Sequence, residues 1–361
     1  MRENLRVKVL DFLEQEIEKK HIPGAVIHVS YKGEAILQEV VGHRVVHPLP
    51  APMQWNSVFD LASLTKVVAT LPSVLKLMEE GDLRLDDYIH TFLPEFGKHG
   101  KDQVRIYHLL THTSGLPAHR NYFLDGLSAE GILASIYEEK LEAAPGEKVV
   151  YSDLGFITLY KLIETVTREP FAEYVRKNIL QPLEMANTSF NPVFARERYA
   201  ATEFSKTLND YKHGIVHDDN TESMGGISGH AGLFSTIDDL AKYSSMIEND
   251  GFYQGKDILS KAALDLTRKN YTSFDQEHRG LGWILKSPHN SSCGDFFSPQ
   301  SYGHTGFTGT SIWFDPTIQL HVILLTNRVH FGRKDPIIKL RPRLHNIIRS
   351  HVLNRGSRHG K

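Results

Sequence analysis

Cysteine is nearly absent from this chain of 361 residues, in which Cys293 is the only one. One cysteine can form neither a disulfide within the chain nor a cluster of thiolate metal ligands. This composition suits a reducing compartment.

Long apolar runs are also missing: no stretch approaches the ~18 to 20 apolar residues that span a bilayer. The first twenty residues mix apolar side chains with charged ones, a pattern that predicts an amphipathic helix rather than a signal peptide. We therefore expect a cytoplasmic protein, and an exported form stays open if a leader has been removed from a longer precursor.

The chain has no excess of either charge, because 41 Lys and Arg stand against 43 Asp and Glu, for a net charge of -2. Nucleic acids and anionic membranes are therefore not expected partners. The expected partner is a small-molecule, peptide or ester substrate, and the oligomeric state stays open.

With 40% hydrophobic residues, the chain can bury a large core. Strand patterns occur at both ends, beginning with a hairpin at "YKGE", and a C-terminal helix is expected over about 336–352. Helical patterns fill the middle. We predict one domain, 1–361, in which a discontinuous α/β lobe (about 1–60 and 225–361) holds a mainly helical lobe (about 61–224).

Two Ser-x-x-Lys matches occur, "SLTK" at Ser63–Lys66 and "SVLK" at Ser73–Lys76. On a helix, either lysine amine can reach its serine hydroxyl. Only Ser63 is expected in the first turn of the predicted helix 64–80, where free backbone N–H groups could stabilise an oxyanion. Ser73 follows Pro72 inside the helix, where packing is the simpler explanation. Spacing alone leaves Ser63 as nucleophile or N-cap.

Two more segments complete a pattern. "PGEKVVYSDLGF" places Tyr151 and Asp153 at the start of another helix, and "YGHTGFTGTSIWFD" places His304, Thr305 and Gly306 where a strand is expected to begin. Ser-x-x-Lys, Tyr-x-Asp and His-Thr-Gly, in this order, resemble the motifs of the serine β-lactamase and penicillin-binding-protein superfamily, nearest the class C branch with its esterases and D-aminopeptidases.

The resemblance covers nearly the whole chain, through blocks such as "HIPGAVIHVSYKGE", "IYHLLTHTSGLP" and "GGISGHAGLFSTIDDLAKY". "VHDDN" before "GGISGHAGLFST" resembles a bacterial subgroup of penicillin-binding-protein-like hydrolases linked to cell-wall peptide metabolism. The fold implied is α/β: an antiparallel sheet flanked by the N- and C-terminal helices, with a mainly helical second lobe.

The resemblance also implies roles for single residues. Ser63 would attack a carbonyl to form an acyl-enzyme, and Lys66 would accept its proton if burial or neighbours keep the amine neutral. Tyr151 would take part in the same proton transfer and titrate together with Lys66 as one unit. The remaining implied residues are the oxyanion-hole N–H groups of Ser63 and Phe307 and the substrate-binding residues Asp153, His304, Thr305 and Gly306.

Two positions depart from the family pattern. Asp153 stands where the family usually has asparagine, which removes an amide donor and adds a carboxylate. His304 stands where lysine is common, so we expect the site to gain a positive charge only as pH falls from ~8 to ~6, through the unperturbed pKa of ~6.5. Both changes make robust β-lactamase activity a weaker expectation.

Neither a metal nor a cofactor is expected. "HLLTH" spaces His108 and His112 like a helical zinc pair, but the glutamate of His-Glu-x-x-His is missing. His217, Asp218 and His230 lie in or beside a block that binds no metal in the family, and "GISGHAG" lacks the Gly-Lys-Ser/Thr ending of a phosphate loop.

The sequence thus predicts a serine hydrolase that acts through an acyl-enzyme on a D-amino-acid-containing peptide, a muropeptide or a small ester. A carboxylesterase without a cell-wall role is one alternative. A penicillin-binding protein that acylates without turnover is another.

Overall fold

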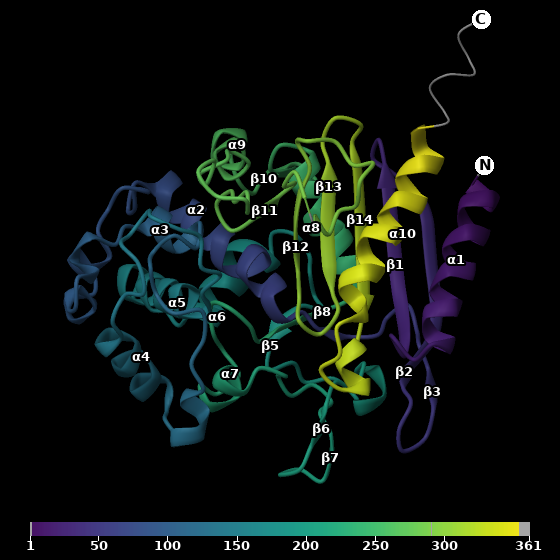
Figure 1. Cartoon of the computed structure of the whole chain (residues 1–361), viewed down its shortest axis with the longest axis horizontal. Coiled ribbons are helices and arrows are strands. Elements are labelled where there is room, and N and C mark those ends of the chain that lie inside the picture. The colour runs from purple at the N-terminus through teal and green to yellow at the C-terminus, as the bar shows by residue number, and fades with distance from the viewer. Residues whose placement is uncertain (1, 290, 354–361) are drawn as a thin grey trace, which may run out of the picture.

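The structure is a computed structural model that describes residues 2–289 and 291–353. It has a seven-stranded antiparallel sheet beside a mainly helical region (Figure 1). The strands lie in the order β11-β12-β13-β14-β1-β2-β3. Their bounds are β1 Gly24–Tyr31, β2 Glu34–Val45, β3 Ala51–Pro52, β11 Ile284–Leu285, β12 Tyr302–Thr305, β13 Ser311–Asp315 and β14 Leu320–Thr326.

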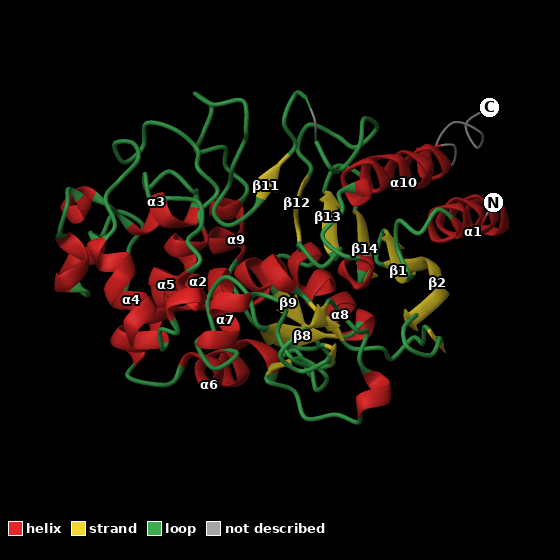
Figure 2. Cartoon of the chain, turned by 60° about the horizontal axis from the view of Figure 1, so that its bottom comes forward, coloured by secondary structure: helices red, strands yellow, loops and turns green. Residues whose placement is uncertain are grey.

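The terminal helices α1 (Arg2–Glu18) and α10 (Pro336–Leu353) lie side by side on one face of this sheet, as Figures 1 and 2 both show. Successive apolar side chains along a strand point to opposite faces of the sheet, and both faces are therefore packed against other elements. In β14, Val322 and Leu324 pack with the two terminal helices, whereas Ile323 and Leu325 join the larger core on the opposite face.

The helical region and the opposite face of the sheet share that larger core. The remaining helices are α2 Leu71–Glu80, α3 Ile106–Leu110, α4 Ala129–Glu138, α5 Asp153–Thr167, α6 Phe171–Val175, α7 Asp219–Ser223, α8 Ile237–Glu248 and α9 Lys261–Thr267. Short strands form three small sheets: β4 (Phe59–Asp60), β8 (Leu233–Ser235) and β5 (Ser189–Phe190) in one, β6 (Phe204–Ser205) and β7 (Asp210–Tyr211) in another, β9 (Phe252–Tyr253) and β10 (Lys256–Asp257) in the third.

The predicted fold class is therefore confirmed: an antiparallel sheet carries the N- and C-terminal helices and adjoins a helical region. The predicted hairpin at "YKGE" is also confirmed, since Lys32 and Gly33 connect β1 and β2 with positive φ angles of 54° and 76°. The division into lobes 1–60 with 225–361 and 61–224 stays a prediction.

Two local predictions were inaccurate. The segment predicted as one helix over 64–80 begins with a 3-10 turn (Ala62–Leu64) and a π-helical turn (Lys66–Thr70), and only then becomes α2, which ends at Gly81 as expected. His304 and Thr305 end β12 rather than begin a strand. The "AGLFST" segment forms β8, which pairs with β4 and β5 in a small sheet.

Among the described residues, none of the helices combines the length and the apolar character that crossing a membrane requires.

Candidate functional site

Ser63 lies in a strained turn between β4 and the π-helical turn. The preceding residue, Ala62, has a φ of 46°, a left-handed conformation that is costly for a residue with a Cβ atom. The buried carboxylate of Asp60 holds this turn, because one of its oxygens accepts the Ala62 N–H at 2.8 Å and the other accepts the His217 N–H at 2.6 Å. The turn thereby presents Ser63 at the start of the helical segment.

Lys66 lies beneath Ser63 and is fully buried. Its Nζ is 2.9 Å from Ser63 Oγ, 2.8 Å from Asp153 Oδ1 and 3.3 Å from the backbone oxygen of His230. An ammonium group has three N–H donors, and these three oxygens can accept all of them. The geometry therefore fits a protonated lysine.

The charges around Lys66 favour the same protonation state. Burial alone would lower the pKa of Lys66, but the Asp153 carboxylate and the Tyr151 hydroxyl outweigh it and raise this pKa above its ordinary value. Burial would raise the pKa of Asp153, and the neighbouring Lys66, His230 and His119 instead hold it well below its usual range. The raised pKa favours the charged Lys66 amine, whereas its predicted role as base requires the neutral one, and that role stays a prediction.

Tyr151 and Asp153 enter the site from the N-terminal end of α5. Two cations lie near the Tyr151 ring: Lys66 Nζ is 4.9 Å and the Arg279 guanidinium carbon is 5.3 Å from the ring centroid. Asp153 also lies 3.4 Å from Nδ1 of His119, and this contact raises the pKa of His119. Tyr151, Lys66 and Asp153 thus form one group around Ser63.

The other wall of the site is β12 and the loop that follows it. Thr308 Oγ1 donates to the backbone oxygen of Asp60 at 2.7 Å, and Thr310 Oγ1 donates to the backbone oxygen of Leu61 at 3.0 Å. A Cβ atom on Gly306 would lie 2.1 Å from Thr310 Oγ1, so only glycine fits there. These contacts bring the backbone of Phe307 to the turn that carries Ser63.

His304 lies in β12 but cannot gain a charge as predicted. It is buried, and burial with the nearby charges of Lys66 and Arg279 lowers its pKa well below the ordinary value. The imidazole therefore stays neutral between pH ~6 and ~8, where an unperturbed histidine would titrate. The expected charge gain in this range was wrong because the sequence does not reveal how deeply the strand residue is buried.

A cleft of about 810 Å³ connects these groups. Its walls include most of the residues predicted from the sequence: Ser63, Tyr151, Asp153, His304, Thr305, Gly306 and Phe307. Lys66 lies under the floor, in contact with Ser63. Seven predicted residues and the buried lysine thus meet in one place.

Sequence reasoning missed several residues of this cleft. Arg279 and Arg341 are buried in its wall, and His119 lies against Asp153. Asp60 was missed too, although an aspartate two residues before a turn is a recognisable signal for a side chain that caps a backbone N–H. The arginines carry no such local signal.

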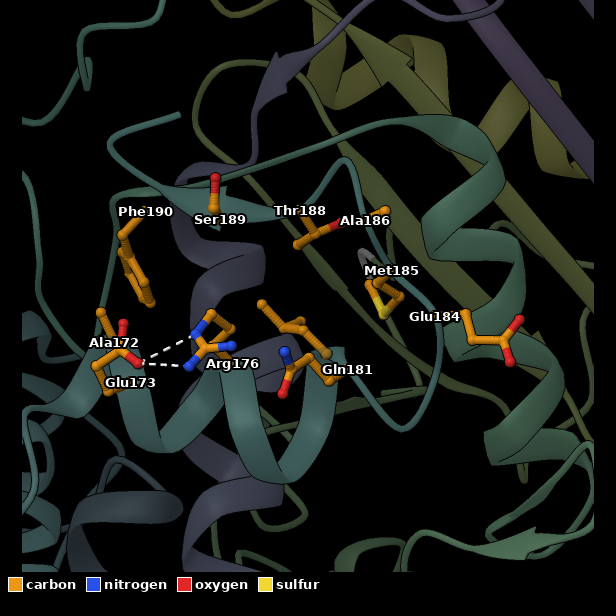
Figure 3. A pocket seen from close by; sticks show the side chains of 11 residues that line it. Ala172, Glu173, Arg176, Gln181, Glu184, Met185, Ala186, Thr188, Ser189 and Phe190 are labelled. Carbon is orange, nitrogen blue, oxygen red and sulfur yellow. Dashed lines mark hydrogen bonds and ion pairs between the residues drawn. The ribbon is translucent and has the colours of Figure 1, made fainter. Parts of the chain in front are cut away.

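A second hollow, of about 500 Å³, lies between α6, the turn after it and the segment that leads into β5 (Figure 3). Arg176 at this hollow pairs with Glu173, with Nη2 to Oε2 at 2.7 Å. None of the predicted catalytic residues lines it. We therefore assign the chemistry to the cleft of Ser63.

The residues considered as metal ligands serve other contacts. His112 Nδ1 accepts the Ser152 N–H, and His230 pairs with Asp218 at 3.0 Å. Within 2–289 and 291–353, His, Cys, Asp and Glu side chains form no group arranged to hold a metal ion.

Comparisons with known proteins show the family to which the chain belongs. The model of the β-lactamase family matches residues 9–345. A protein of Escherichia coli (strain K12) named "Putative D-alanyl-D-alanine carboxypeptidase" is 34% identical over an alignment of 324 residues, and the match covers 80% of this chain and 73% of that protein.

Solved structures are similar in fold. EstCE1, a hydrolase with promiscuous acyltransferase activity, has a TM-score of 0.79 at 22% identity and covers 96% of this chain and 99% of its own. A class C β-lactamase has a TM-score of 0.76 at 20% identity, with 96% of both chains covered. From its match to the family model and its likeness to the Escherichia coli protein, the chain belongs to the β-lactamase family of serine hydrolases.

Proposed function

We propose that this enzyme forms an acyl-enzyme at Ser63 and hydrolyses a D-amino-acid-containing peptide, a muropeptide or a small ester. One observation carries the proposal: Lys66 Nζ contacts both Ser63 Oγ and Asp153 Oδ1 at the floor of the cleft. A serine hydroxyl held by a buried cation, in a cleft with room for a substrate, is the arrangement that nucleophilic catalysis needs.

In this proposal the Lys66 ammonium and the Tyr151 hydroxyl titrate together, and the active form of the pair has lost one proton. The three acceptors around Lys66, one of which is the Asp153 carboxylate, favour the remaining proton on the lysine. The Tyr151 oxygen then takes the proton of Ser63 during attack and gives it to the leaving group as the tetrahedral intermediate collapses. Water then attacks the acyl carbon while the Tyr151 oxygen takes its proton. The bond between the acyl group and Ser63 Oγ breaks as Tyr151 returns this proton to Ser63.

The tetrahedral intermediate carries a negative charge on the former carbonyl oxygen. We assign its stabilisation to the backbone N–H groups of Ser63 and Phe307, which belong to two segments tied together by Thr308 and Thr310. Because backbone donors held in this way need no rearrangement, they stabilise the charge as it develops.

Two observations favour different substrates. The name of the Escherichia coli relative supports a peptide that ends in D-amino acids. Phe307 and Ile338 line the same cleft with 47% and 62% of their surface exposed, and this apolar rim favours an ester with an apolar group. A penicillin-binding protein that acylates without turnover is the third candidate.

A substrate panel distinguishes these functions. We expect a peptide ending in D-Ala-D-Ala to be turned over, with an acyl adduct on the Ser63 peptide in rapidly quenched samples analysed by mass spectrometry. Turnover of p-nitrophenyl esters alone would assign the enzyme to the carboxylesterases. A stable adduct with a β-lactam and no turnover of any substrate would favour the third candidate, and no adduct with any of them would contradict the proposal.

The variant Asp153→Asn should shift the pH profile of kcat/KM for a neutral ester to lower pH by about one unit or more, the usual scale for an opposite charge in contact. The Asp153 carboxylate raises the pKa of Lys66, so without this carboxylate burial lowers the pKa of Lys66. Asp218→Asn is the matched control, because Asp218 pairs with His230 instead. Equal profiles for Asp153→Asn and wild type would contradict this role of Asp153.

A further inference from the structure

A further hollow, of about 430 Å³, adjoins the cleft of Ser63. The segment 328–335 contributes side chains to both cavities. Glu203 lines the hollow and pairs with two residues of the cleft, since its Oε2 lies 2.9 Å from Arg333 Nε and 3.0 Å from His217 Nε2. The hollow and the cleft therefore share a wall.

We call this space the ring hollow, because its walls include the rings of His47, Phe204, Tyr211, His330 and Phe331. The ring centroids form an unbroken series: 5.4 Å from Phe204 to Tyr211, 4.3 Å from Tyr211 to His330, and 6.0 Å from His330 to both His47 and Phe331. Phe204 and Tyr211 come from the hairpin of β6 and β7, which projects at the bottom of Figure 1. His47 and Phe204 are exposed, and Tyr211 is half-buried. A contiguous group of ring faces, unlike a single exposed side chain, marks a binding surface.

The ring hollow is held in one shape by His330. Its Nε2 accepts the backbone N–H groups of Val46 and His47 at 2.9 and 3.2 Å, and its Nδ1 donates to the backbone oxygen of Thr202 at 3.1 Å. An imidazole that accepts at one nitrogen and donates at the other is neutral. Burial lowers the pKa of His330 to about 4, so this state holds at neutral pH. A ligand therefore meets a preformed surface and spends little free energy in ordering it.

Charged groups lie beside the rings. Lys20 and Lys334 line the ring hollow and are exposed, and Glu203 provides carboxylate oxygens. An ammonium group offers three donors, and a carboxylate offers acceptors. An entirely apolar ligand would cover these groups without replacing their hydrogen bonds to water, which costs free energy. A small inorganic ion would leave the rings unused.

A pyranose ring satisfies both requirements, because its faces carry C–H groups and its edge carries hydroxyl groups. We propose that the ring hollow binds a sugar that is linked to the peptide substrate. The C–H face of the sugar packs on Phe204 and Tyr211, and its hydroxyl groups bind Lys20 and Lys334. The volume of the hollow lies within the range of small-molecule sites, ~300 to 1,000 Å³. The inference rests on the proposed function and adds to it a binding site that distinguishes glycan-linked peptides from free ones.

The first test compares kcat/KM for a disaccharide peptide that ends in D-Ala-D-Ala with kcat/KM for the same peptide without the sugars. Wild type should prefer the disaccharide peptide. Phe204→Ala and Tyr211→Ala should each lower this preference at least about fivefold, the scale of one lost ring contact. Tyr211→Phe keeps the ring and should retain the preference. Phe252→Ala is the matched control and should leave it unchanged, because Phe252 is similarly exposed on the hairpin of β9 and β10, outside both cavities.

The second test needs no turnover. Titration with the N-acetylglucosamine dimer, followed by NMR, should give the same Kd for wild type and Ser63→Ala, and a Kd at least about fivefold higher for Phe204→Ala. The proposed function fails separately, if a fluorophosphonate does not label Ser63 and no substrate is turned over, and the titration then still decides whether the ring hollow binds a sugar.

The sugar site would be overturned if wild type did not prefer the disaccharide peptide, or if Phe204→Ala and Phe252→Ala lowered the preference equally. A dimer of the chain that light scattering detects in wild type and not in Phe204→Ala would assign the ring hollow to a second copy and likewise overturn the proposal. If Tyr211→Ala does not fold, Phe204→Ala and Tyr211→Phe decide the question.

Discussion

Ser63→Ala should abolish covalent labelling by a fluorophosphonate and lower turnover by a factor on the order of 10⁶, the scale seen when a serine nucleophile is removed. The hydroxyl is the group that Lys66 holds at 2.9 Å, and alanine leaves the cleft without a nucleophile at this position. Intact-mass and peptide mapping of labelled protein, with steady-state kinetics on a neutral ester, measure both effects.

Ser73→Ala is the matched control from the second Ser-x-x-Lys sequence. Ser73 is fully buried in α2, and its Oγ donates to the backbone oxygen of Ala69 at 2.7 Å. Its loss removes one hydrogen bond within the helix and should leave labelling unchanged. Adduct mass on the Ser73 peptide, or labelling that survives in Ser63→Ala, would refute the assignment of the nucleophile.

Much of the fold could be predicted because it depends on local patterns. Residues that alternate between two cores define β13 and β14, the Lys32-Gly33 turn defines the first hairpin, and Gly81 ends α2 with a φ of 85°. The irregular start of the helix after Ser63 could not be predicted in this way. Tertiary contacts hold it, such as the hydrogen bond from the Tyr243 hydroxyl to the Val67 oxygen at 2.5 Å.

In the cleft, residue identities could be predicted but protonation states could not. The Ser63 and Lys66 spacing is local, whereas the carboxylate that sets the charge of Lys66 comes from α5, 87 residues away. His304 is a similar case: burial, which no motif encodes, lowers its pKa. Arg279 is the extreme case, because no signal in the sequence marks this residue and only the fold brings it to Tyr151.

Lys66→Ala and Tyr151→Phe should each lower the rate of acylation at least ~100-fold, within the usual range for a general acid or base. In the proposed mechanism, Lys66→Ala removes the cation that orients Ser63, and Tyr151→Phe removes the oxygen that takes the proton of Ser63. In Lys66→Ala, Asp153 keeps His119 as a partner at 3.4 Å, so the carboxylate is not left alone. Lys76→Ala, in the second Ser-x-x-Lys sequence, is the matched control and should have little effect, since Lys76 pairs with Glu79 outside the cleft.

The double variant Lys66→Ala with Tyr151→Phe should lose less than the product of the two single losses. In the proposed mechanism the two groups share one proton, so either single change already removes the pair that moves this proton, and the second change has little left to remove. Single-turnover acylation by a neutral ester measures the rates. Thermal unfolding of each variant shows whether the buried site is still folded. Losses that multiply would mean that Lys66 and Tyr151 act independently, with the lysine serving only to orient Ser63.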